Sequence, residues 1–426
     1  MIDAQSTRPT SRRTLYRSLL MTAVFVLPAV VLRVSGIHPN PVVSLLAFGA
    51  AVVAASFVLA WAAESAQIDV SGGLAIAVLA LIAVLPEYAV DLYYAYTAGH
   101  NAEYVQYAAA NMTGSNRLLM GIGWPVVVIV GLFVARKAAD RNGRKVLPLE
   151  PGNRVELGFL LIAGLVAFII PATGRISLIL GVAMLAWFGF YLYKMTRGEP
   201  EEPDLIGTAA AIGELPQRAR RITVSVLFVL AGVVILMCAE PFANSLVGAG
   251  TQLGVDRFLL VQWLAPLASE APEFIIAIIF ASRGKSTAAI ATLISSKVNQ
   301  WTLLVGSLPI AYLAGGGGTA LVLDGRQIEE MLLTATQTLM GVALILSLRF
   351  HRYTAWTLLA LFLVQFPITS TTGRLVLCGI YGALTVAGVI INRRHVAATL
   401  RAPFVDPGNG HLGVSAGGRV LFAVDK

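Results

Sequence analysis

The sequence predicts an all-α polytopic membrane protein with about twelve transmembrane helices. The chain has 426 residues, of which 57% are hydrophobic and 13% are charged, whereas soluble proteins carry about 25% charged residues. Apolar runs of about 20 residues recur along the chain, and each is long enough to cross about 30 Å of hydrocarbon. The basic residues gather in alternate loops between these runs, as they do in multi-pass membrane proteins.

The predicted spans follow one another closely, apart from a polar linker at 195–221. In chain order they cover residues 16–34, 42–64, 74–98, 103–135, 155–171, 175–194, 222–246, 257–281, 286–313, 329–348, 353–369 and 375–392. A cleaved signal peptide is the alternative for the first of them. The tail beyond Asn392 is rich in glycine and predicts a flexible segment.

The distribution of basic residues predicts the orientation of the chain. They lie in alternate loops, at 136–145, 197–221, 283–285, 349–352 and 393–394. Because basic loops stay in the cytoplasm, both termini are predicted to be cytoplasmic, in a plasma or inner membrane. The loops also account for the formal net charge of +8, so the lipid bilayer is the expected partner and no nucleic acid is predicted. The oligomeric state is left open.

Two stretches of the chain repeat one pattern. Residues 85–125 and 272–301 each contain a Pro-Glu pair within a span, then a glycine-containing turn, then a polar cluster inside another apolar run. The predicted topology sends the first Pro-Glu helix outward and the second inward. Repeats of opposite orientation are typical of transporters whose substrate site lies at the repeat interface near the midplane of the membrane.

The Pro-Glu pairs predict a cation site. Pro86 and Pro272 each remove a backbone donor, so a carbonyl in the preceding turn lacks its helical partner. In lipid, a bound cation or a water-lined cavity satisfies such a carbonyl. Glu87 and Glu273 follow these prolines, and carboxylates inside a membrane are costly and usually functional. Brought together from opposite repeats, they offer the hard oxygen ligands that Na⁺ or Ca²⁺ requires.

These two stretches resemble the α-repeats of the cation/Ca²⁺ exchanger superfamily, whose pattern is T-S-x-P-E, a spacer and G-S-N-x-x-N. Ser269 stands at the Thr position and Gln300 at the later Asn position. The other matching residues are Pro86, Glu87, Gly114, Ser115 and Asn116 in the first repeat and Pro272, Glu273 and Ser296 in the second.

The resemblance implies a core of two inverted five-helix repeats with one extra helix at each end. It divides the chain into an N-terminal segment, a first repeat, a cytoplasmic linker, a second repeat and a C-terminal segment, at 1–41, 42–194, 195–221, 222–371 and 372–426. It also implies metal ligands at Glu87, Glu273, Ser115, Ser296, Ser269, Gln300 and Asn116.

Four charged side chains depart from the superfamily pattern. Glu270 takes a Ser position and Asp91 lies one turn after Glu87; both are further candidate ligands, with ion pairs to Lys297 and Arg117 as the alternatives. Arg117 directly follows Asn116, which matches the Asn of the G-S-N pattern. In the second repeat, Lys297 stands where that Asn would be. If all of them face the site, four carboxylates and two cations leave two negative charges, enough for one divalent ion, two monovalent ions or two protons. Lys297 could stand in for a bound Na⁺ or exchange a proton.

The predicted function is secondary active antiport of Ca²⁺ or Na⁺ against Na⁺ or H⁺ by alternating access. A passive cation channel and a non-transporting scaffold with structural carboxylates are the alternatives. The sequence contains no zinc-protease motif such as H-E-x-x-H and no recognisable nucleophile with its base. An enzyme is therefore not predicted, and no cofactor is expected beyond the transported cations. The sequence leaves the identity of the cation and of the coupling ion open.

Overall fold

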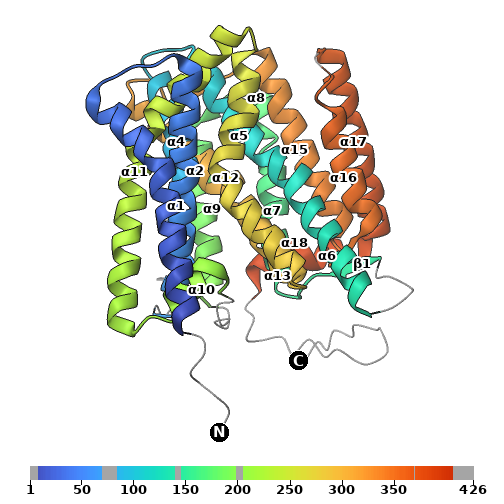
Figure 1. Cartoon of the computed structure of the whole chain (residues 1–426). Helices are drawn as coiled ribbons and strands as arrows, with labels where there is room; N and C mark the ends of the chain where they lie inside the picture. The colour runs from blue at the N-terminus through green and yellow to red at the C-terminus, as the bar shows by residue number, and fades with distance from the viewer. Residues whose placement is uncertain (1–7, 70–83, 140–144, 198–204, 369, 406–426) are drawn as a thin grey trace.

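The computed structural model describes residues 8–69, 84–139, 145–197, 205–368 and 370–405, which form a bundle of long helices (Figure 1). The first half contains α1 (Arg8–Ser35), α2 (Pro41–Ala66), α4 (Leu85–Ala98), α5 (Tyr104–Leu118), the π-helical turn η1 (Leu119–Gly123), α6 (Trp124–Ala139), β1 (Val146–Pro148), α7 (Asn153–Val166), α8 (Ile169–Thr173), β2 (Arg175–Ser177) and α9 (Leu178–Met195).

The second half begins with a short helix in the polar linker. It contains α10 (Gly207–Gly213), α11 (Gln217–Leu253), α12 (Arg257–Ser282), α13 (Ser286–Asn299), the π-helical turn η2 (Gln300–Leu304), α14 (Val305–Ala314), β3 (Ala320–Val322), α15 (Gly325–Ile345), β4 (Arg349–His351), α16 (Arg352–Val364), α17 (Thr371–Ile391), α18 (Arg393–Arg401) and the 3₁₀ turn η3 (Ala402–Phe404).

The helices confirm a polytopic membrane protein. Within the described residues, nine helical stretches are long and apolar enough to cross a bilayer. Three further predicted spans coincide with shorter helices: α4, the interrupted helix α13–η2–α14, and α16. Residues 74–83 of the predicted span 74–98 lie outside the described part of the chain. The count of twelve spans stays a prediction.

The order of elements repeats between the halves. The series α4, α5, η1, α6 in the first half has the counterpart α12, α13, η2, α14 in the second. A short strand follows each series, and each strand pairs with the other half: β1 is antiparallel to β4, and β2 to β3. Apart from these four short strands, the described residues are nearly all helical or in turns, as expected of an all-α chain. Each strand has only three residues, too few to show the alternating pattern by which strands are recognised in sequence.

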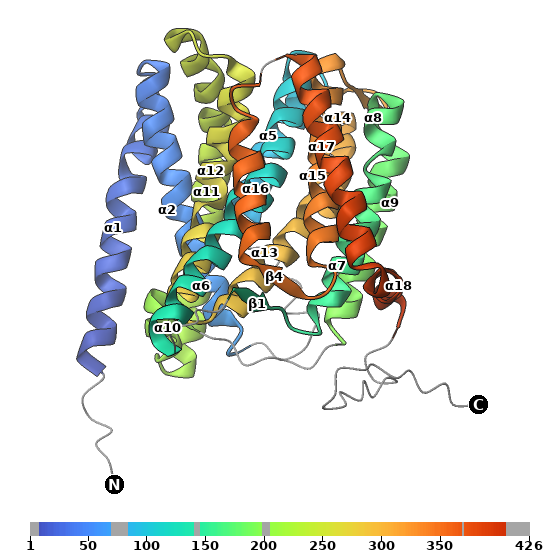
Figure 2. The same cartoon turned by 90° about the vertical axis from the view of Figure 1, so that its right-hand side faces the viewer.

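The extra helices lie on opposite sides of the bundle. Helix α1 packs along α2, which packs along α11, while α17 packs along α15 (Figures 1 and 2). The start of α1 and helix α18 lie at the same end of the bundle (Figure 2). Helix α18 corrects the prediction of flexibility for the part of the tail that is described. Arg154 holds it by donating a hydrogen bond to Thr399 at 3.1 Å.

Two helices that carry candidate ligands approach each other very closely. A Cβ atom added to Gly114 in α5 would lie 1.7 Å from the backbone oxygen of Gln262 in α12. Only glycine permits this backbone contact. It brings the polar cluster that follows Gly114 against the helix that carries Glu270 and Glu273.

Candidate cation-binding site

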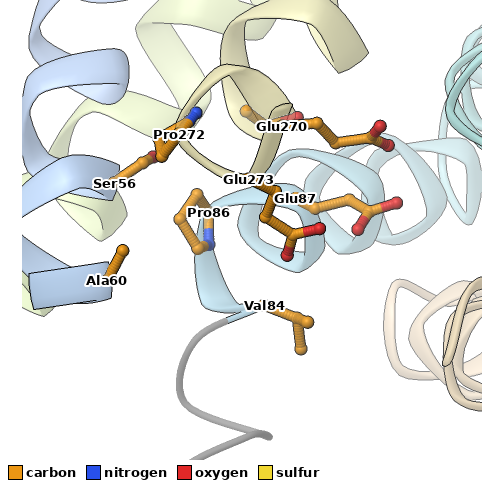
Figure 3. Close-up of a pocket in the computed structure, with 9 residues that line it drawn as sticks. Ser56, Ala60, Val84, Pro86, Glu87, Glu270, Pro272 and Glu273 are labelled. Atoms are coloured by element: carbon orange, nitrogen blue, oxygen red, sulfur yellow. The ribbon is translucent and has the colours of Figure 1, made fainter. Parts of the chain in front are cut away.

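A cavity of about 40 Å³ lies between α2, α4 and α12 (Figure 3). This volume is comparable with the roughly 30 Å³ that one water molecule occupies in the liquid. Both Pro-Glu pairs face it, although they are far apart in the sequence. The residues that line the cavity are Ser56, Ala60, Val84, Pro86, Glu87, Ser269, Glu270, Pro272 and Glu273.

The prolines shape both acidic walls of the cavity. Pro86 lies in the first turn of α4, where a missing N–H costs nothing. Glu87 follows in the same turn, so its negative charge lies near the positive end of the helix dipole. Pro272 lies inside α12, where it leaves the carbonyl one turn earlier without its helical donor. The sequence missed Ser56 on α2, because a lone serine in an apolar run is usually bonded to its own helix, as Ser56 is to Val52.

Hydrogen bonds from α13 and η2 orient two of the three carboxylates. The Ser296 hydroxyl donates to Glu273 at 2.5 Å. The Gln300 amide donates to Oε1 of Glu270 at 2.7 Å. Ser269 turns its hydroxyl back to the carbonyls of Ala265 and Pro266. The polar cluster of the second repeat, which contains Ser296 and Gln300, therefore forms a layer behind the carboxylates of α12.

Ser115 lies close to both Glu87 and Glu270, and Gln300 lies close to Glu87. Even so, several buried oxygens here have no partner with good hydrogen-bond geometry among the described residues. They are Oε1 of Glu87, Oγ of Ser115, Oε2 of Glu270 and Oε1 of Gln300. Buried polar atoms are nearly always partnered, and carboxylate, hydroxyl and amide oxygens are the ligands of hard cations. In the described part of the chain, no three acidic, histidine or cysteine side chains group closely enough to hold a metal alone. Hydroxyl and amide oxygens are therefore needed to complete a coordination shell.

Asn116 and Lys297 contact each other across the two halves. Both side chains are fully buried. The Lys297 ammonium donates to the backbone oxygen of Asn116 and, at 3.0 Å, to its Oδ1. The Asn116 amide donates to the Met112 carbonyl at 3.0 Å. The predicted ligand Asn116 thus already binds a cation that belongs to the chain itself.

Asp91 lies one helical turn beyond Glu87 and does not line the cavity. It is completely buried and lies close to the Asn111 side chain, but neither of its carboxylate oxygens has a partner with good hydrogen-bond geometry among the described residues. The charge of Asp91 acts on Glu87. Asp91 does not pair with Arg117, the alternative that the sequence left open for it.

Arg117 corrects the predicted charge balance because it belongs to a separate ionic cluster. It forms a buried ion pair with Glu330 on α15 and donates to Gln365 at 3.1 Å. Glu330 also forms an ion pair with Arg374 at 3.0 Å and accepts a hydrogen bond from Gln262 at 3.1 Å. Without Arg117, the four predicted carboxylates and Lys297 leave three negative charges instead of two. The adjacent acids Glu329 and Glu330 at the start of a predicted span were the available sequence signal for this cluster.

A buried acidic cavity shared by two proline-containing helices from different halves of a membrane bundle defines a cation transporter. Comparison with known proteins agrees: a family model described as sodium/calcium exchanger protein matches residues 40–197 and 223–370. The chain belongs to the sodium/calcium exchanger family and is a cation antiporter. No curated protein matches the chain.

Solved structures show the same fold. A crystal structure of the H⁺/Ca²⁺ exchanger CAX is 39% identical, with a TM-score of 0.86, over 92% of this chain and 98% of that chain. The Ca²⁺/H⁺ antiporter YfkE is 16% identical, with a TM-score of 0.58, over 86% and 99%. The sodium-calcium exchanger NCX_Mj is 18% identical, with a TM-score of 0.50, over 78% and 99%. The last two likenesses concern the fold alone.

Proposed function

We propose that the protein exchanges Ca²⁺ for H⁺ across the membrane. The observation that carries the proposal is that Glu87, Glu270 and Glu273 line one cavity between the two halves (Figure 3). Carboxylates bind Ca²⁺ when ionised and release it when protonated, so one set of side chains can serve both ions in turn. The 39% identity with a H⁺/Ca²⁺ exchanger supports this choice of ions.

In the proposed cation-bound state, Glu87 and Glu273 coordinate Ca²⁺ from opposite sides of the cavity. Glu270 and the Ser115 hydroxyl supply further oxygens, since each has an unpartnered buried atom. Ser269 and Gln300 complete the shell, while Ser296 orients Glu273. Asn116 acts through Lys297, and Asp91 adds negative charge from the next turn of α4.

We propose that the two halves form repeats of opposite orientation in the membrane. The repeats are 42–194 and 222–371, joined by the linker 195–221 and flanked by 1–41 and 372–426. The matching element order of the halves and the crosswise strand pairs support it. With twelve spans, both termini lie in the cytoplasm of a plasma or inner membrane. The presence of the start of α1 and of α18 at one end of the bundle agrees with an even number of crossings (Figure 2).

Alternating access follows from how the cavity is closed. Ser56 and Ala60 on α2 form one wall, and α2 packs along α11 over much of its length. We place the moving boundary there: displacement of the α2–α11 pair against α4 and α12 exposes the carboxylates to one side at a time.

Proteoliposomes test this function. An imposed pH gradient is expected to drive Ca²⁺ uptake, and a Na⁺ gradient is not. Glu87→Gln and Glu273→Gln are expected to abolish uptake, because each removes a charge from the cavity. Glu103→Gln is the matched control, since Glu103 forms a half-exposed ion pair with Arg257 outside the cavity. Ca²⁺ on the opposite side accelerates exchange in an antiporter but not in a passive channel. Uptake that survives both cavity substitutions would support the channel alternative, and a wild-type protein that shows no uptake would support the scaffold alternative.

A further inference from the structure

Lys297 is a completely buried basic side chain beside the acidic cavity. Its ammonium donates to two oxygens of Asn116, one on the backbone and one on the side chain. The negative charges of Glu270 and Glu87 act on it, and so does the positive charge of Arg117. A lysine ammonium is a compact point charge on a flexible stem, so it can be held much as a bound monovalent cation is held.

Lys297 and Asn116 stand at equivalent positions of the two halves. Asn116 lies three residues before the π-helical turn η1, and Lys297 lies three residues before η2. The hydrogen bonds between them therefore join corresponding points of α5 and α13. With an asparagine at each of these positions, both halves would offer an amide oxygen to a bound ion. In this chain, the ammonium of Lys297 from the second half instead occupies the oxygens of Asn116 in the first half.

The charges around the cavity show what this cation balances. Arg117 is not counted, because Glu330 already compensates its charge. Glu87, Asp91, Glu270 and Glu273 leave three negative charges after Lys297 is counted. One Ca²⁺ then leaves a single excess charge, which one proton balances. Without Lys297, one further monovalent cation would be needed for the same balance.

We infer that Lys297 is a resident cation that determines ion specificity: its ammonium fills the place of a monovalent metal ion at Asn116 and so prevents Na⁺ from competing with Ca²⁺. The inference deepens the proposed Ca²⁺ exchange and rests on it. Two physical effects produce the exclusion. The ammonium uses the Asn116 oxygens that Na⁺ would need, and its positive charge repels a second small cation nearby.

The test compares the purified full-length protein with Lys297→Asn, which removes the ammonium and supplies an amide oxygen. Calcium affinity is measured by titration calorimetry with about 150 mM NaCl or with choline chloride at the same ionic strength. The wild-type affinity is expected to be equal in the two salts. In Lys297→Asn, Na⁺ is expected to weaken Ca²⁺ binding about tenfold relative to choline. Lys297→Arg keeps the charge and, if it folds, is expected to keep Na⁺ from weakening Ca²⁺ binding.

Direct binding of radioactive ²²Na⁺ separates this inference from the proposed function. Lys297→Asn is expected to bind Na⁺ that the wild-type protein does not bind, whether or not Ca²⁺ is the transported ion. Lys297→Gln carries the same readouts if Lys297→Asn does not fold, as judged by gel filtration and thermal unfolding. The inference is overturned if Na⁺ affects wild type and variants equally, or if neither variant binds ²²Na⁺. A wild-type protein that binds no Ca²⁺ overturns the proposed function instead.

Discussion

Arg117 on α5 and Glu330 on α15 form an ion pair in which both side chains are almost completely buried. The Arg117 guanidinium also lies over the Trp263 ring, 4.9 Å from its centroid. Glu330 in turn holds Arg374, so the pair links the polar cluster of the first half to the extra helix α17. The pair therefore fixes the position of α5 beside the cavity, and Glu330 compensates the charge of Arg117.

Breaking this pair is expected to destabilise the protein strongly. Arg117→Gln leaves Glu330 with only part of its compensation, and loss of one partner of a buried pair costs about 3–5 kcal/mol. Arg257→Gln, which breaks a half-exposed pair with Glu103, is expected to cost about 1 kcal/mol or less. Thermal unfolding in detergent checks both. The double variant Arg117→Met/Glu330→Leu is expected to lose less stability than the summed losses of Arg117→Met and Glu330→Leu. A loss equal to that sum would mean that the two side chains do not interact.

Gly114→Ala is expected to separate α5 from α12. The new methyl group would overlap the Gln262 backbone oxygen, which cannot move without its helix. Overpacking of this kind costs about 1–3 kcal/mol or more. Gly189→Ala in α9 is the control, because no neighbouring atom lies within 4 Å of the added carbon. Equal unfolding temperatures for the two variants would show that the close contact does not matter.

Ser296→Ala is expected to weaken Ca²⁺ binding by about tenfold to a hundredfold, because a hydrogen bond to a charged group contributes about 1.5–3 kcal/mol. The lost bond is the one that orients Glu273. Ser295→Ala is a matched control, since the neighbouring hydroxyl is hydrogen-bonded to Tyr191 instead. Calorimetric titration of Ca²⁺ measures both. A larger loss of affinity in the control would place the site on the other face of α13.

The contact between Asp69 and Arg220 is expected to make stability depend on pH in acid. The two hydrogen bonds from Arg220, at 2.6 and 2.8 Å, lower the pKa of the Asp69 carboxyl from 3.8 to about 2. A carboxyl whose pKa is lowered on folding stabilises the fold at pH values above its unfolded-state pKa, and this stabilisation is lost as the pH falls through its folded-state pKa. Asp69→Asn is therefore expected to be about 1 kcal/mol less stable than wild type at pH 7.

The difference between wild type and Asp69→Asn is expected to narrow between about pH 4 and pH 2. Thermal unfolding at a series of pH values measures it. Because Asp69 follows α2 and Arg220 lies in the first turn of α11, the pair ties together the ends of two helices that we expect to move as a unit. A constant difference down to pH 2 would show that the carboxyl is not held by Arg220.

The sequence by itself determined the membrane bundle and the acidic centre of the site. Long apolar runs can satisfy their backbone in lipid only as helices, so their approximate positions follow from composition. Carboxylates beside prolines inside two such runs predicted that Glu87 and Glu273 meet, and both line the same cavity. The patterns are local, and the cost of a charge in lipid is large enough to make them informative.

Only the tertiary structure decided which charges face that centre. Asn116 and Arg117 are consecutive on one helix, and successive side chains point about 100° apart, so one turns to Lys297 and the other to Glu330. The direction of each depends on how α5 is rotated against α12 and α15, and no pattern within α5 contains that rotation. It is set by the backbone contact at Gly114 and by partners more than a hundred residues away.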